Sequence, residues 1–261
     1  MAVGIAAAAL VGSATLARGA PQSQGAAEAP GPTGFQEDFD LANRRLADAG
    51  ESRYFVLRPG FQTVLASGGT GTGGLRRMFG QLLPLPGSGR TTLTITVLDE
   101  TREINGVVTR VVEEREETDG QLSEVARNFF AIDPQTGDVF YFGEEVDFYR
   151  RGRVVDHVGS WLAEGPNRAG LIMPGTPAVG MKYYQELAHP SAMDRAEVIS
   201  TAEQCSTPAG LFESCLVTRE TTPLEPDVVE HKSYAPGIGL VQDKALRLVS
   251  YGDVTSTQPR G

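Results

Sequence analysis

The chain is 261 residues long, with 40% hydrophobic residues and a formal net charge of −10 at pH 7. This length and apolar content suffice for one large hydrophobic core, so we expect a single folded domain. The segment from Asp99 to Asp147 holds fourteen acidic residues and four arginines, and it accounts for the whole charge imbalance. An acidic chain without a basic groove argues against nucleic acid as a partner. We interpret these acids as a solvated outer sheet face or, alternatively, as a face that attracts cations.

Residues 1–20 have the composition of a signal-like segment. Met1 to Ala17 is an uncharged, Ala-rich apolar run, and it is too short to span a membrane. Residues 21–34 are rich in Pro, Gln, Ala and Gly, which predicts a disordered leader. We therefore expect an exported bacterial protein, secreted or periplasmic, with no membrane span and with one β domain over residues 35–261.

The domain begins with a segment whose pattern is helical. Phe35 to Ala49 places apolar residues among charged ones, which predicts a short amphipathic helix. Tyr54 to Leu57 and Gln62 to Ala66 then flank Arg58-Pro59-Gly60, which indicates two strands around a turn. A Gly-rich excursion over residues 67–89 follows, and we expect it to connect two strands.

The middle of the chain, from Arg90 to Arg153, predicts an antiparallel meander. Leu93, Ile95 and Val97 alternate with threonines, and Asn105-Gly106 then supplies the positive φ that a tight hairpin needs. Three further turn sequences divide the rest of the region: Asp119-Gly120, Asp133 to Gly137, and Arg151-Gly152.

Strand patterns return in the last third of the chain. They occur in six segments: Tyr183 to Leu187, Ala196 to Ser200, Leu211 to Glu220, Val228 to Tyr234, Ile238 to Gln242 and Leu246 to Tyr251. The total of about a dozen strands is too many for one flat sheet. The predicted fold is therefore mainly β, with a single strongly curved antiparallel sheet, a half-barrel or open barrel, and one or two short helices.

Three short motifs resemble a group of bacterial exported β-sheet proteins that includes the TapB-like family. They are Tyr54 to Gly60 (YFVLRPG), Thr207 to Phe212 (TPAGLF) and Glu230 to Val241 (EHKSYAPGIGLV). The resemblance implies a strongly curved antiparallel sheet that wraps like a half-barrel, similar to periplasmic lipoprotein-carrier folds. It implies no established reaction.

A half-barrel has a concavity into which one set of alternating side chains points. Such a concavity holds an apolar ligand unless side chains fill it. Six aromatic residues form the predicted ligand-binding lining: Phe140, Phe142, Tyr149, Trp161, Tyr183 and Tyr184.

Acidic residues and one histidine gather on both sides of the Arg151-Gly152 turn. Residues across such a hairpin come within cross-strand distance. Carboxylates suit Ca²⁺, and an added imidazole suits Zn²⁺ or Cu²⁺. Five residues make up this candidate divalent-cation site: Glu144, Glu145, Asp147, Asp156 and His157. The alternative is a set of ordinary surface ion pairs with the neighbouring arginines.

The chain has two cysteines, Cys205 and Cys215, which flank a turn sequence at residues 207–210. In an exported protein this arrangement predicts a disulfide that closes a short loop. The alternative is two separate thiols.

Motifs for catalysis are not found in the sequence. It contains no Gly-x-Ser-x-Gly and no His-Glu-x-x-His, and the glycine run at residues 68–74 is not followed by Lys-Ser or Lys-Thr. A non-enzymatic binding protein for a small apolar or amphiphilic ligand, or for a partner, is therefore our first hypothesis. A divalent-cation-binding protein is the second. The third is a hydrolase or isomerase whose site forms only in three dimensions.

Overall fold

The structure is a computed structural model that describes residues 34–67, 75–78, 81–84 and 89–254. The signal-like segment and the predicted leader up to residue 33 lie outside the described residues. So do residues 68–74, 79–80 and 85–88 of the Gly-rich excursion. Strands dominate the described part of the chain, and no α-helix occurs in it.

The elements follow one another along the chain in an almost uninterrupted series of strands. The first are η1 (Leu41–Asn43), a short 3₁₀ turn, and the strands β1 (Glu51–Ser52), β2 (Phe55–Val56), β3 (Phe61–Ser67), β4 (Leu75–Met78), β5 (Gln81–Pro84) and β6 (Thr91–Ile104). The middle strands are β7 (Val107–Thr118), β8 (Gln121–Ile132), β9 (Val139–Arg150), β10 (Arg153–Asp156), β11 (Trp161–Leu162) and β12 (Arg168–Met173). The last are β13 (Lys182–Tyr184), β14 (Glu186–Leu187), β15 (Arg195–Thr207), β16 (Gly210–Thr222), β17 (Glu225–Ala235), β18 (Gly239–Asp243) and β19 (Leu246–Asp253).

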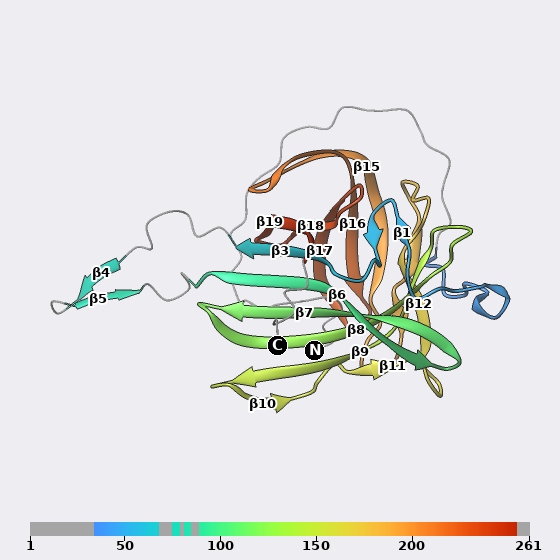
Figure 1. The fold of residues 1–261 in the computed structure, drawn as a ribbon, viewed down its shortest axis with the longest axis horizontal. Helices are drawn as coiled ribbons and strands as arrows, with labels where there is room; N and C mark the ends of the chain where they lie inside the picture. The colour runs from blue at the N-terminus through green and yellow to red at the C-terminus, as the bar shows by residue number, and fades with distance from the viewer. Residues whose placement is uncertain (1–33, 68–74, 79–80, 85–88, 255–261) are drawn as a thin grey trace, which may run out of the picture.

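Fifteen of these strands form one large antiparallel sheet, which is not closed by hydrogen bonds. Its order is β13-β15-β16-β17-β18-β19-β3-β6-β7-β8-β9-β12-β14, and β10 and β11 also pair with β9. In Figure 1, β6 to β9 run across the view, whereas β15 and β16 stand nearly upright in it. The prediction of a mainly β chain with an antiparallel sheet is confirmed.

The predicted hairpins of the central meander are confirmed by the register. Ile104 pairs with Val107 around the Asn105-Gly106 turn, where φ is 49° and 79°. Such left-handed values are accessible to Asn and Gly at low cost, and they match the twist of the two strands. The sequence chemistry of the turn therefore sets which residues of β6 and β7 face each other.

The two ends of the sheet are neighbours in the sequence. The strand order begins with β13, which ends at Tyr184, and finishes with β14, which begins at Glu186, so Gln185 alone separates them. Gly170 on β12 lies against this junction, because a Cβ atom there would be 2.5 Å from the carbonyl oxygens of Tyr184 and Gln185. A side chain at position 170 would push β12 away from the junction of β13 and β14.

The predicted helix over Phe35 to Ala49 is wrong. The segment is mostly extended and contains only the three-residue turn η1. Gln36 forms a bridge to Tyr183, and Ala47 exchanges backbone hydrogen bonds of 2.8 Å with Ile132. Backbone N–H and C=O groups of this segment form hydrogen bonds with strand residues of the sheet. They therefore do not form the hydrogen bonds of a helix.

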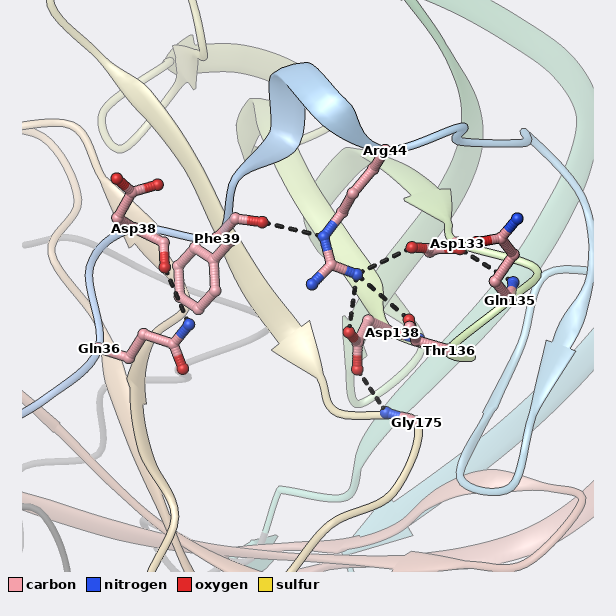
Figure 2. A network of polar contacts seen from close by, with 9 residues as sticks. All are labelled: Gln36, Asp38, Phe39, Arg44, Asp133, Gln135, Thr136, Asp138 and Gly175. Atoms are coloured by element: carbon pink, nitrogen blue, oxygen red, sulfur yellow. Dashed lines mark hydrogen bonds and ion pairs between the residues drawn. The ribbon is translucent and has the colours of Figure 1, made fainter.

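Arg44 attaches this segment to the turn between β8 and β9 (Figure 2). Its Nη1 donates to Asp133 Oδ2 at 2.8 Å and to Asp138 Oδ2 at 2.9 Å, and its Nε donates to the carbonyl oxygen of Phe39 at 2.9 Å. The guanidinium also lies 4.9 Å from the centre of the Phe140 ring. One partly buried cation thus holds two carboxylates, a backbone carbonyl and an aromatic ring together.

We predict that Arg44→Ala lowers the free energy of unfolding by about 2 kcal/mol. It removes several charge-assisted hydrogen bonds and leaves the buried Asp133 carboxylate without its cation. Urea denaturation followed by the fluorescence of Trp161 measures the change. Arg45→Ala is the matched control, because Arg45 is exposed, and we expect a change below about 0.5 kcal/mol. Equal effects of the two substitutions would contradict the role given to Arg44.

Candidate functional site

A cavity of about 60 Å³ lies against one face of the sheet. Residues from strands that are far apart in the sheet order line it: Phe55 and Val56 of β2, Phe61 and Thr63 of β3, Ile95 and Val97 of β6, Val112 and Glu114 of β7, Phe130 of β8, Ile172 of β12, Tyr234 of β17, Ile238, and Gly239 and Leu240 of β18. Most of these side chains are aliphatic or aromatic. The cavity therefore has an apolar wall with a few polar groups, which is the usual composition of a small-molecule site.

Glu114 is the charged side chain among the described residues that line the cavity. It pairs with Ile95 on β6 and with Ala126 on β8, and only 4% of its surface is exposed. Its Oε2 atom has no hydrogen-bond partner among the described residues. A buried carboxyl oxygen without a partner is costly, and it marks a place where a ligand could supply the missing donor.

Glu114 belongs to a larger group that we call the buried acid cluster. Its members come from both halves of the sheet and from the loop before β15: Glu114, Glu124, Glu144, Glu186, Asp194, Glu220 and Asp243. Apart from Asp194, each is less than one tenth exposed. Carboxyl groups so far from water are stable only when they are protonated or when a positive charge pairs with them.

Burial raises the pKa values of most members of the cluster. Loss of solvent is the main cause for Glu114, whose pKa rises to about 8, and for Glu124, whose pKa rises to about 7. The pKa of Glu144 lies well above its ordinary value for the same reason. For Asp194 and Asp243 burial raises the pKa to about 6. Several of these carboxyl groups therefore keep their protons near neutral pH.

Lys232 supplies a positive charge to the cluster. Its Nζ lies 2.7 Å from Glu220 Oε2, and both side chains are buried. Burial lowers the pKa of Lys232, but the carboxylates of Glu220 and Asp243 outweigh it and hold that pKa well above its ordinary value. Glu220 Oε1 also accepts hydrogen bonds from Thr218 at 3.0 Å and from Tyr234 at 3.3 Å. The charge of Lys232 is thus already matched by a well-bonded carboxylate.

The acidic segment from Asp99 to Asp147 is not simply a solvated outer face. Glu114, Glu124 and Glu144 point to the buried side, whereas Glu103 and Glu145 are exposed. The sequence analysis does not predict the burial of Glu114, because the run from Glu113 to Glu117 is uniformly hydrophilic. The available signal was the two-residue period, which puts Glu114 on the same face as Val112.

The six aromatic residues of the predicted lining are not at this cavity. Phe140, Phe142, Trp161 and Tyr183 are packed in the hydrophobic core, Tyr184 is buried and Tyr149 is half-buried. Phe140 packs against Phe39 of the N-terminal segment, with ring centres 6.0 Å apart. Trp161 packs against Tyr141 at 5.2 Å. These rings fill space between elements, and different aromatic side chains, such as those of Phe55 and Phe130, line the cavity.

The five residues of the predicted cation site are brought together only in part. His157 Nδ1 lies 2.8 Å from Asp147 Oδ1, and Asp156 Oδ1 accepts from the backbone N–H of His157. Glu145 pairs with Arg102 on the outside, and Glu144 is buried on the opposite face. Among the described residues, no group of three or more His, Cys, Asp or Glu side chains is placed to hold a metal ion.

The structure differs from the predicted disulfide, since Cys205 and Cys215 are two free, buried thiols. The register explains this: Cys205 is opposite Phe212, and Cys215 is opposite Glu203. Cys215 Sγ donates to the carbonyl oxygen of Phe212 at 3.6 Å. Burial, with a hydrogen bond to Cys205, raises the pKa of Cys215 to about 12.

No protein-family model matches the chain, and comparisons with curated proteins and with solved structures found no match either. The resemblance of the three motifs to the TapB-like family stays a prediction.

None of the described residues belongs to a helix that is long and apolar enough to cross a membrane.

We predict that Glu114→Gln changes how stability depends on pH. The folded wild-type chain holds the Glu114 proton up to about pH 8, whereas the unfolded chain releases it near its ordinary pKa of 4.5. Folded protein therefore binds more protons between these values, and wild-type stability falls as the pH rises. The amide has no proton to lose, so the variant should exceed the wild type by on the order of 5 kcal/mol at pH 8.5 and by little at pH 4.5.

Urea denaturation at pH 4.5, 6.5 and 8.5 checks this expectation. Glu103→Gln is the matched control, because Glu103 lies exposed on the adjacent strand β6. We expect this variant to keep the wild-type pH profile. The assignment of a buried, protonated Glu114 is wrong if Glu114→Gln also keeps that profile.

We predict that neither thiol reacts with Ellman's reagent at pH 8 while the protein is folded, and that both react in urea. Both sulfur atoms are buried, and the raised pKa of Cys215 keeps it protonated. The absorbance of the released thiolate counts the reactive groups. Finding no reactive thiol in urea would instead reveal a disulfide.

Proposed function

We propose that this protein is an exported, non-enzymatic binding protein that holds a small apolar or amphiphilic ligand inside a curved β-sheet. The observation that carries the proposal is the cavity with an apolar wall and the unpartnered carboxyl oxygen of Glu114. Such a site binds a molecule with an apolar body and a single polar group. Export rests on the composition of residues 1–20.

Two observations support a sheet that curves round on itself like a half-barrel. The first is the single residue between the opposite ends of the sheet order, because one residue spans at most about 3.6 Å of chain. The second is the cavity, whose lining joins β6 and β7 to β17 and β18. Strands that are distant in the order thus contribute to one interior, which is the concavity that the proposal requires.

The size of the cavity limits the ligand. Cavities that enclose a drug-sized molecule measure roughly 300–1,000 Å³, and this one measures about 60 Å³. Since one water molecule needs about 10–15 Å³ of such space, a ligand of about four non-hydrogen atoms fits, or one short arm of a larger ligand. A cavity of this size therefore favours a small molecule or the tip of an amphiphile.

Acid–base catalysis, as in a hydrolase or isomerase, is a second candidate function. The observation that favours it is the pKa of Glu114, which at about 8 lets this group both give and take a proton near neutral pH. Turnover separates the two candidates. A binding protein returns its ligand unchanged, whereas an enzyme with Glu114 as its base converts the molecule that occupies the cavity.

We predict that the protein binds 1-propanol and that Val112→Phe abolishes this binding. The added ring occupies the cavity that Val112 lines. Titration of ¹⁵N-labelled protein measures binding through the amide resonances of Ile95, Val112 and Leu240. Val108→Phe is the matched control, because Val108 lies on the same strand but is 48% exposed, and it should bind as the wild type does. If Val112→Phe does not fold, Val97→Leu replaces it as a smaller filling of the same cavity.

The proposal fails if 1-propanol shifts no cavity resonance of the wild type. It also fails if the filled variant binds as well as the wild type does.

A further inference from the structure

The polar part of the cavity holds the carboxyl group of Glu114, which accepts hydrogen bonds when it is ionised. Three polar side chains among the described residues line it, those of Thr63, Glu114 and Tyr234, and Tyr234 donates its hydroxyl to Glu220 at 3.3 Å. Glu114 Oε2 has no partner among the described residues. The unpartnered atom is thus a carboxyl oxygen in a mostly apolar space, and a hydrogen-bond donor on a ligand complements it when Glu114 is ionised.

The charges of the groups around Glu114 determine which charge is favoured on the donor group of a ligand. Glu124 on β8, Glu144 and Tyr141 on β9, and Lys232 and Asp243 on β17 and β18 act electrostatically on Glu114. Three of these five groups are carboxyl groups, and Glu114 itself is a fourth carboxyl group.

Lys232 does not reverse this balance, because its ammonium group lies 2.7 Å from Glu220 and is matched by it. An additional anion would be repelled by the ionised carboxyl groups, and a neutral hydroxyl would gain little from them. An additional cation would be attracted by every carboxylate that ionises.

We propose that the ligand's polar group is a primary ammonium group, which binds the Glu114 carboxylate while a short alkyl chain fills the apolar part of the cavity. This proposal rests on the binding function proposed above and specifies its ligand class as a small aliphatic amine. The three N–H donors of an ammonium group suit the open Oε2 atom. A charge-assisted hydrogen bond of this kind is stronger than a neutral one.

Binding of the cation is coupled to loss of a proton. The protonated Glu114 carboxyl group releases its proton to the solvent. The positive charge of the bound ammonium group then balances the negative charge of the carboxylate. Net charge is conserved: one cation enters the site and one proton leaves it. Since the pKa of Glu114 is about 8 in the free protein, the apparent affinity for the amine should rise about tenfold per pH unit below that value.

The test compares propylammonium with 1-propanol, which has the same chain length and no charge. NMR titrations at pH 6 and pH 8.5 give the dissociation constant of each probe. We expect propylammonium to bind at least about tenfold more tightly than 1-propanol at pH 8.5, and this preference to shrink at pH 6. The ¹³C resonance of the Glu114 carboxyl carbon should move to its ionised position at pH 7 only when the amine is added.

Glu114→Gln should remove the preference for the amine and leave 1-propanol binding in place. Glu103→Gln, on the exposed side, should keep the preference. If Glu114→Gln does not fold, Glu114→Met provides an uncharged replacement of similar length, and the carboxyl resonance of the wild type remains an independent readout.

The outcomes separate the two proposals. If both probes bind equally at pH 8.5, or if the Glu114 carboxyl resonance does not move, the amine proposal is overturned and the binding function stands. If neither probe shifts a cavity resonance, the binding function fails as well.

Discussion

The interior of this protein depends on keeping its buried carboxyl groups protonated or paired. Glu114 and Glu144 are almost completely removed from water, and their raised pKa values reflect the cost of a charge there. Glu220 meets the same cost by ion pairing with Lys232. A core with these groups is less stable than an apolar one would be when the acids ionise. Their presence is consistent with the binding function that we propose.

The site and the fold are consequences of the same strand order. The cavity needs β7 on one side and β17 and β18 on the other, and these strands are separated by several others in the sheet. The first described segment packs against the sheet, because Arg44 forms ion pairs with the turn that joins β8 and β9. These polar groups serve different purposes. The ion pairs of Arg44 hold a segment in place, whereas Glu114 has a carboxyl oxygen without a hydrogen-bond partner among the described residues.

Local chemistry was enough to predict most strands and turns, because a sequence such as Asn105-Gly106 determines its own backbone conformation. It failed for Phe35 to Ala49, where backbone bonds to distant strands replaced a helix. The aromatic residues around Phe140 are predicted from the sequence to line a concavity, but Phe140 instead packs in the core against Phe39 of the first described segment. Glu114 was missed because hydrophilic neighbours concealed its inward position. The cavity itself joins residues more than a hundred positions apart, which no local pattern contains.

Gln185 is the single residue between the two strands that end the sheet order. In the hairpins of β6 to β9, turns join successive strands, and an extra residue there would lengthen a turn. Between β13 and β14 the chain passes directly from the first strand of the order to the last. An inserted or deleted residue here would therefore change the spacing between the two strands that end the sheet order.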